Sequence, residues 1–215
     1  MKIHREDSYW VALFSGTGRE IENICKHYNT YPDVIVCNSK LPISSELLEI
    51  AIENKISLWV CPSSDKVSVD QYLRWFTSTN GKKQFITLHG WMKIIPDTIC
   101  QQFEIYNLHP GDIETYPELK GKDPQEKAFK LKHNHCGCVI HRVTGEVDSG
   151  EIVTALRDFN FYKCVSKDQA IECLHNLAFK TWLQFLSKIQ FAYIPQKLSL
   201  IDKFNLKFFK LFRKC

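Results

Sequence analysis

Several features that would place this chain in a special class are missing from its sequence. No run of about 18 uncharged apolar residues exists, so we expect no membrane-spanning helix. The segment from Met1 to Asp7 contains no apolar run, so we expect no signal peptide. No internal repeat or low-complexity segment is present, which excludes repeat architectures.

A disulfide framework and a structural metal site are also poorly supported. The chain has 9 cysteines, an odd and scattered set, and six of them stand among apolar neighbours. That pattern is typical of buried free thiols in a reducing compartment, so we expect a cytoplasmic protein. The segment His133–Cys138 has metal-ligand residue types, but no second pair stands at zinc-site spacing. We therefore expect no metal there, and a loop that enters a strand.

The remaining composition is that of an ordinary globular protein. The 215 residues are 44% hydrophobic and 24% charged, with a net charge of +4. Much of the positive excess lies in the last twenty residues, so we expect no nucleic-acid partner. The chain is predicted to divide into a globular domain over 1–187 and a basic amphipathic tail over 188–215. The tail's apolar stripe would pack on the domain or on a second subunit in a homodimer, and contact with a membrane surface is the less favoured alternative.

Strands and helices alternate through the first half of the chain. Short apolar strands are predicted at 9–15, 33–37, 57–61, 85–88 and 105–108, and amphipathic helices at 19–28, 44–54, 67–77 and 95–103. A long loop at 110–123, a helix at 124–131, strands at 136–143 and 151–156 and a long helix at 166–186 follow. The order predicts a Rossmann-like α/β fold, with a mostly parallel twisted sheet, helices on both faces and a C-terminal helical tail.

An amide, an imidazole and a carboxylate indicate the chemistry. Asn107 and His109 end the strand at 105–108, and Asp148 lies in a later loop. The carboxyl ends of strands collect the active sites of open α/β sheets. An amide and an imidazole stabilise an oxyanion or move a proton, and a carboxylate sets the charge of the imidazole. The three residues are therefore predicted to form an acyl-transfer site.

A glycine-containing turn joins the first strand to the first helix. Gly16, Thr17, Gly18 and Arg19 are candidates for binding a phosphate of the substrate, because a turn and free helix N–H groups hold anions. The turn lacks the third glycine of a dinucleotide fingerprint and the Lys-Ser/Thr of a nucleotide loop. Glu20 stands beside it and opposes an anion. The alternative, a strand-to-helix turn that uses glycine only for its shape, stays open.

The ordered series of motifs resembles the folate-dependent formyltransferase family, over about Val11 to Leu186. The segments that carry the resemblance are Phe14–Gly18, Cys37–Lys40, Leu88–Ile95, Tyr106–Pro110, Cys138–Val143 and Val147–Ile152. The resemblance implies 10-formyltetrahydrofolate as donor, with no metal. It implies that Asn107 and protonated His109 stabilise the oxyanion while Asp148 holds the imidazole charged. The donor cleft that it implies is lined by Met92, Lys93, Ile94, Ile95, Val143 and Val147.

Departures from the family pattern limit the prediction of the acceptor, which is expected to be a small-molecule amine. Gly111 to Glu114 replace the usual Ser-Leu-Leu-Pro of the purine enzymes, and 120–124 is more similar to the transfer-RNA and sugar formyltransferases. The family's acceptor-binding glutamate falls on Leu174 or a neighbour. A glycinamide ribonucleotide-like acceptor leads, an amino-sugar nucleotide is the runner-up, and methionyl-tRNA is disfavoured. A non-catalytic folate-binding relative is the remaining alternative.

Overall fold

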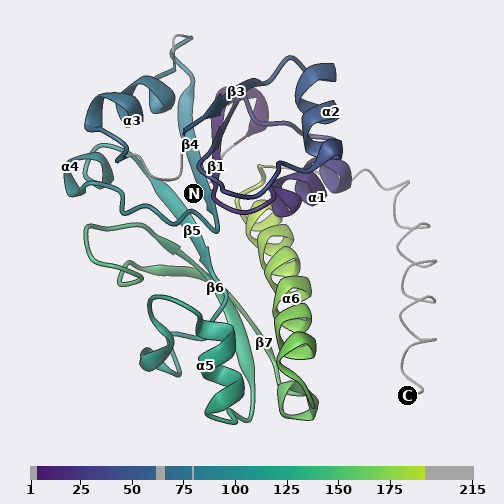
Figure 1. The fold of residues 1–215 in the computed structure, drawn as a ribbon. Helices are drawn as coiled ribbons and strands as arrows, with labels where there is room; N and C mark the ends of the chain where they lie inside the picture. Colours follow the sequence, from purple (N-terminus) through teal and green to yellow (C-terminus); the bar gives the residue numbers. More distant parts are fainter. Residues whose placement is uncertain (1–3, 62–65, 79, 192–215) are drawn as a thin grey trace.

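The computed structural model of the chain is built on one seven-stranded sheet (Figure 1). It describes residues 4–61, 66–78 and 80–191. The strand order is β3-β2-β1-β4-β5-β6-β7. The strands are β1 (Ser8–Phe14), β2 (Val34–Cys37), β3 (Ser57–Val60), β4 (Lys83–His89), β5 (Ile105–His109), β6 (Cys136–Arg142) and β7 (Ile152–Asp158).

The first five strands are parallel, and the last two are not. β1 pairs with β2 and β4, β2 with β3, and β4 with β5, all in parallel register. β6 pairs with β5 and with β7 in antiparallel register. The sheet order reverses direction outward from β1, and such a switch point gathers the carboxyl ends of neighbouring strands around one crevice.

The helices are α1 (Arg19–Tyr28), α2 (Ser45–Glu53), α3 (Val69–Phe76), α4 (Asp97–Cys100), α5 (Pro124–Lys130) and α6 (Lys167–Lys188). Three single 3₁₀ turns, Arg5–Asp7, Pro117–Leu119 and Phe161–Lys163, complete the elements. Figure 1 shows α3 and α4 on one side of the sheet and α1, α2 and α6 on the other. Helices therefore cover both faces, as predicted.

Alternation along β1 divides its side chains between two cores. Trp10, Ala12 and Phe14 pack with α1 and α6. Val11 and Leu13 pack with α3 and α4. A strand whose two faces are both covered is apolar at every position, which explains the continuous hydrophobic run at 9–14. β3 is one of the two edge strands and is correspondingly open, with Val60 64% exposed.

The predicted alternation and fold class are confirmed, and the boundaries shift by a few residues. The largest difference concerns the helix predicted at 95–103, because α4 contains only four residues, Asp97–Cys100. Pro96 precedes it, and the residue before a proline is held in extended backbone, so Ile95 cannot start a helix. α6 begins after the cap Ser166, whose side chain accepts a hydrogen bond from Gln169 N, as predicted.

The predictions about the tail, membrane-spanning helices and the cysteines can be compared with the structure only over the residues that it describes. The tail predicted at 188–215 lies outside them from residue 192 onward, so its helix and its packing stay predictions. Within the described part of the chain, no helix has both the length and the apolar character that crossing a membrane requires. The eight cysteines described there, Cys25 to Cys173, are all free thiols.

Candidate active site

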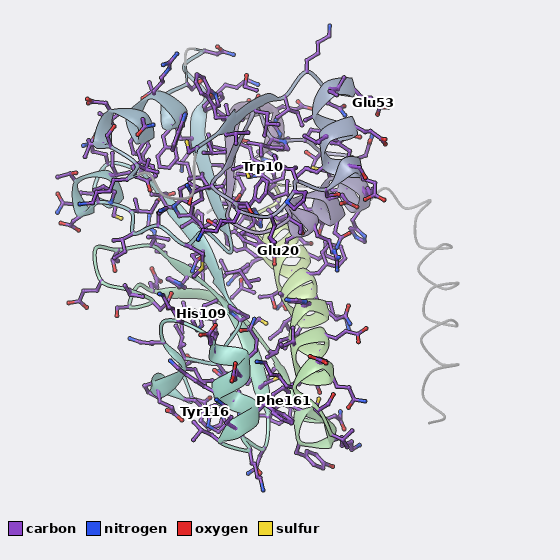
Figure 2. All side chains as sticks on the ribbon, viewed as in Figure 1. Trp10, Glu20, Glu53, His109, Tyr116 and Phe161 are labelled. Atoms are coloured by element: carbon purple, nitrogen blue, oxygen red, sulfur yellow. The ribbon has the colours of Figure 1, made fainter. Side chains whose placement is uncertain are left out.

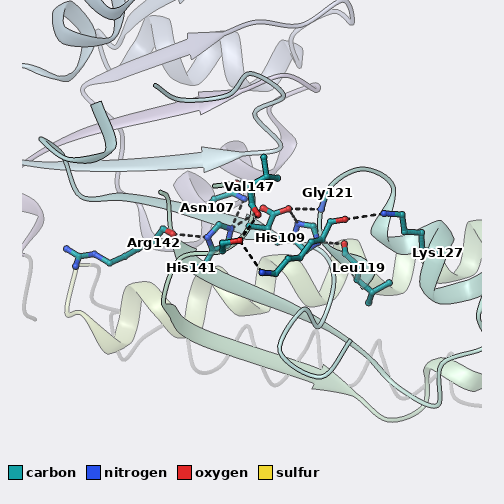
Figure 3. Close-up of polar contacts among 11 residues, drawn as sticks. Asn107, His109, Leu119, Gly121, Lys127, His141, Arg142 and Val147 are labelled. Atoms are coloured by element: carbon teal, nitrogen blue, oxygen red, sulfur yellow. Dashed lines mark hydrogen bonds and ion pairs between the residues drawn. The ribbon is translucent and has the colours of Figure 1, made fainter. Parts of the chain in front are cut away.

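The predicted catalytic residues come together at the carboxyl end of β5. Tyr106 and Leu108 pack in the core beneath α6, so the alternation of the strand turns Asn107 and His109 to the opposite face. β6 lies beside them, with His141 paired to Asn107 and Val139 paired to His109. Figure 3 shows the polar contacts that join these strand ends to the loops above them.

His109 is held by an acceptor on each ring nitrogen. Its Nδ1 lies 3.1 Å from Oδ2 of Asp148, and its side chain is only 5% exposed. Its Nε2 lies 2.9 Å from the carbonyl oxygen of Leu119. A carboxylate and a carbonyl both accept, so this geometry suits an imidazole that carries a proton on each nitrogen. The loop predicted to be functional, 110–123, thus reaches back to His109.

Asp148 is a buried carboxylate among hydrogen-bond donors. Gly121 N donates to its Oδ2 at 2.9 Å, and Nε2 of His141 lies 3.3 Å from its Oδ1. Burial alone would raise the pKa of Asp148, but hydrogen bonds from His109, His141 and Gly121 hold that pKa well below its usual range. Its backbone is left-handed, with φ 49°, a region that aspartate tolerates better than most residues. The residue is therefore an anion at neutral pH.

His141 belongs to this site, although the sequence assigned it no role. Its Nδ1 lies 2.9 Å from the carbonyl oxygen of Arg142, and its Nε2 lies 3.1 Å from Nδ2 of Asn107. The same Nε2 faces Oδ1 of Asp148, so the ring lies between the Asn107 amide and the Asp148 carboxylate and positions both. The cross-strand pairing of 107 with 141 is the signal, and it becomes visible only with the sheet register.

Two loops form the walls of the predicted donor cleft. Met92, Ile94 and Val147 are 63%, 74% and 55% exposed, which is high for large apolar side chains. The loops adjoin, because a Cβ on Gly145 would lie 2.7 Å from Oδ1 of Asp97 at the start of α4. Exposed apolar side chains gathered beside polar groups are typical of a ligand site.

The other predicted cleft residues are less open. Lys93 is half-buried, and Val143 packs partly against the core on the α4 side. Ile95 is a core residue, 3% exposed, so its side chain faces the interior and only its backbone borders the cleft.

The predicted phosphate turn stands at the start of α1. Gly18 is the cap of α1 with φ 82°, and a Cβ there would lie 2.3 Å from Cδ2 of Leu47. That glycine is therefore required by the backbone and by packing, whether or not an anion binds. Gly16 meets nothing within 4 Å of a Cβ position, and Arg19 is exposed beside it. Phosphate binding by 16–19 stays a prediction.

The loop after His109 is anchored by a buried carboxylate that the sequence did not single out. Asp112 is 0% exposed. It accepts hydrogen bonds from Arg157 Nε at 2.7 Å and Nη2 at 3.1 Å, and from His135 Nε2 at 3.1 Å. Burial opposes its ionisation, but Arg157 and Thr115 hold the pKa of Asp112 below its usual value. Asp112, one of the residues that depart from the family pattern, thus ties this loop to Arg157 and His135. We call these three bonded residues the loop base.

Glycines make room for this loop base. A Cβ on Gly137 would lie 2.9 Å from Cβ of Asp112, and one on Gly111 would lie 3.1 Å from the His109 ring. Since real Cβ contacts are rarely this short, both positions favour glycine. The His109 imidazole and the Asp112 side chain are therefore packed directly against the backbone of these two glycines.

The histidines and cysteines of the segment His133–Cys138 have partners within the protein. His133 stacks on Tyr116 with ring centroids 3.8 Å apart, and His135 bonds Asp112. Cys136 and Cys138 are buried in the core. No group of three or more metal-ligand side chains gathers among the residues that the structure describes.

The sequence is similar to those of known formyltransferases. The formyl transferase family model matches residues 11–157. A phosphoribosylglycinamide formyltransferase of Dictyostelium discoideum is 30% identical over 169 residues, covering 66% of this chain and 79% of that protein. The human trifunctional purine biosynthetic protein adenosine-3 is 22% identical over 66% of this chain, a match that spans only 14% of that longer protein.

Solved structures agree on the fold. The phosphoribosylglycinamide formyltransferase of Campylobacter jejuni has a TM-score of 0.67 at 19% identity, over 85% of this chain and 97% of that one. At such identity the likeness concerns the fold, with its mixed seven-stranded sheet. Since the family model covers more than half of the sequence and its motifs coincide with the site, the chain belongs to the folate-dependent formyltransferase family.

Proposed function

We propose that this protein transfers the formyl group of 10-formyltetrahydrofolate to the primary amine of glycinamide ribonucleotide. The observation that carries the proposal is the buried Asn107–His109–Asp148 constellation at the strand ends. The acceptor nitrogen forms a bond to the formyl carbon, the bond from that carbon to the folate nitrogen breaks, and one proton passes from the acceptor nitrogen to the folate nitrogen. The products are the formamide and tetrahydrofolate.

Asn107 and His109 stabilise the oxygen that becomes negative during this step. His141 positions the Asn107 amide, and an amide N–H donates to the formyl oxygen. Both N–H groups of His109 are engaged by Asp148 and Leu119, and its imidazolium form supplies positive charge on the same face of β5. Fixed donors of this kind each contribute on the order of 3 kcal/mol to lowering a barrier.

Asp148 stabilises the charged imidazole of His109 and orients the proton that leaves the acceptor nitrogen. Its anionic carboxylate, beside Nδ1 of His109, stabilises the charged ring. The same carboxylate borders the space between loops 119–121 and 144–148, where it orients the departing proton or a water that relays it. The left-handed backbone of Asp148 and the hydrogen bond from Gly121 N keep that oxygen in place.

The chain's own residues fit the folate donor. Met92, Ile94 and Val147 offer exposed apolar surface to an aromatic ring system, and Lys93 and the backbone around Ile95 and Val143 border it. Polar edges of the ring would meet backbone groups of the loop 92–97. This placement leaves the formyl group over Asn107 and His109, because the two loops flank those strand ends.

The acceptor proposal rests on the relatives and on the first turn of α1. Two of the similar proteins, from Dictyostelium discoideum and Campylobacter jejuni, are phosphoribosylglycinamide formyltransferases, which favours this acceptor over an amino-sugar nucleotide. Gly16, Thr17 and Arg19 are the groups that we assign to the acceptor's phosphate, since Arg19 is exposed and the turn is open at Gly16.

The test is a paired turnover assay. Purified protein with 10-formyltetrahydrofolate is mixed with glycinamide ribonucleotide, or with a set of amino-sugar nucleotides, and tetrahydrofolate release is followed. We expect release with glycinamide ribonucleotide alone. Release only with the sugar nucleotides would contradict the acceptor, and tight folate binding without turnover on any amine would contradict the enzyme.

A further inference from the structure

Glu20 is held at the junction of α1, β4 and α6 by two N–H donors. Its Oε2 lies 2.7 Å from Nδ1 of His89 and accepts a hydrogen bond from Nε1 of Trp182 at 2.8 Å. The side chain of His89 is 1% exposed and Trp182 is 0% exposed, whereas that of Glu20 is 25% exposed. Figure 2 shows Glu20 beside the end of α6 that meets α1. The carboxylate is therefore held by two buried donors and is still partly exposed to solvent.

A chain of hydrogen bonds through the sheet sets the direction of these contacts. Trp10 Nε1 donates to Thr87 Oγ1 at 2.9 Å, and Thr87 Oγ1 lies 2.9 Å from Nε2 of His89. The Glu20 carboxylate can only accept, so Nδ1 of His89 carries a proton and donates it to Glu20. The contacts of Thr87 with Trp10 and with Nε2 of His89 hold the ring behind the carboxylate. The network therefore gives Glu20 a rigid support.

The other carboxylate oxygen of Glu20 is not used by this network. Among the residues at 4–61, 66–78 and 80–191, no hydrogen bond or ion pair reaches its Oε1. The neighbouring Glu22 differs, because Lys26 and Ser44 engage both of its oxygens. A carboxylate that is oriented on one oxygen and free on the other is prepared to accept a hydrogen bond from a ligand.

This carboxylate lies at the carboxyl end of β4, the strand beside the one that carries Asn107 and His109. His89 follows Leu88, which pairs with Asn107. Burial together with the nearby charge of Glu20 raises the pKa of the Cys138 thiol, and the residue after Cys138 pairs with His109. Glu20 thus lies at the end of β4 on the α6 side, and its charge is felt at Cys138 on β6. The donor loops stand on the α4 side, so a nucleophile at Glu20 approaches from the side opposite the folate.

No acidic side chain of α6 lies on the face of the helix that packs against the sheet. The inward face of α6 consists of Ala170, Leu174, Ala178, Thr181, Trp182, Phe185 and Leu186. The acidic residues of the helix, Asp168 and Glu172, are exposed on its outer side. Glu20 is therefore the carboxylate available on the α6 side of the described site.

We infer that Glu20 binds the acceptor by accepting a hydrogen bond from its amine nitrogen, with His89 and Trp182 as positioning residues. The inference rests on the proposed function and deepens it. The carboxylate attracts a nitrogen that donates and repels a phosphate. The acceptor's phosphate therefore lies toward Gly16 and Arg19, and its amine lies toward Glu20, beside the formyl carbon.

The experiment combines two protein variants with two ligands. Glu20→Gln keeps the size and one carbonyl oxygen but removes the charge, and Glu53→Gln is the matched control on an exposed position of α2. The ligands are glycinamide ribonucleotide and its glycolamide analogue, in which a hydroxyl replaces the amine. Calorimetric binding without donor, the KM for the acceptor, the folate Kd and the Tm are measured for each protein.

We expect Glu20→Gln to weaken amine-ligand binding at least about tenfold, in the range of a lost charged hydrogen bond. The hydroxyl analogue should lose less, and the folate Kd and the Tm should stay near those of Glu53→Gln. An unchanged KM in Glu20→Gln, or equal losses for both ligands together with a lowered Tm, would overturn the inference. If the unmodified protein neither binds nor formylates glycinamide ribonucleotide, the proposed function itself fails, which is a separate result.

Discussion

The Nδ1 atom of His109 lies 3.1 Å from Oδ2 of Asp148, although the two residues come from the end of β5 and from the loop between β6 and β7. The same carboxylate oxygen accepts from Gly121 N at 2.9 Å. One oxygen atom therefore links the His109 imidazole to the loop that follows it. Two elements far apart in the sequence become one unit, and the proposed reaction depends on that unit.

Replacement of Asp148 by asparagine should remove activity while the fold stays intact. Asparagine tolerates the left-handed backbone at this position and keeps the size of the side chain. We expect kcat to fall by about 100-fold or more, because the imidazolium loses its counter-charge. Asp123→Asn is the matched control, since Asp123 is an exposed aspartate with φ 55°. Similar activity in the two variants would show that Asp148 has no catalytic role.

The stabilisation by Asp148 should disappear in acid. Its folded-state pKa is depressed, so its ionised form stabilises the fold above the unfolded pKa of about 3.9, and that stability is lost as the pH falls through the folded value. Urea unfolding of the unmodified protein and of Asp148→Asn, between about pH 5 and about pH 3, measures this. The difference in unfolding free energy should shrink as the pH falls. A difference that grows on acidification would reverse the assigned direction of the pKa shift.

Gly111→Ala should affect catalysis more than stability. The added Cβ would lie 3.1 Å from the His109 ring and 3.0 Å from Cβ of Pro124, so the imidazole must shift by a few tenths of an ångström. Since small displacements of a catalytic group are costly, we expect kcat to fall about tenfold or more. Thermal unfolding in parallel distinguishes this from a folding defect. Unchanged kcat would mean that the ring has room to move without consequence.

Arg157→Met should destabilise the loop base. The variant leaves Asp112 buried with His135 as its remaining ionisable partner, and breaking a buried ion pair typically costs about 3 kcal/mol of unfolding free energy. Urea unfolding measures the loss. Lys167→Met, which breaks the exposed pair with Glu126, is the comparison and should change stability little. Equal effects of the two variants would contradict the anchoring role of Asp112.

The sequence predicted the features that depend on local pattern. Apolar runs bounded by turns located the strands, and Ser166 marked the start of α6 through its hydroxyl. The strand ends at Asn107 and His109 followed from the same reasoning. These predictions succeed because propensity, capping and burial act over a few residues.

Contacts between distant residues were not predictable in the same way. The pairing of Asn107 with His141 depends on the register of β5 and β6, and the network of Glu20, His89 and Trp182 joins three elements. From sequence, Glu20 was only a charge that opposed phosphate binding. The fold turns its side chain toward His89 and Trp182, so its charge serves a different purpose there.

One measurement tests the central claim most directly: product analysis after incubation of the protein with 10-formyltetrahydrofolate and glycinamide ribonucleotide. We expect formylglycinamide ribonucleotide and tetrahydrofolate in equal amounts, with both lost in Asp148→Asn. Tetrahydrofolate released with free formate and no formylated amine would contradict transfer to this acceptor, and would mean that the site passes the formyl group to water.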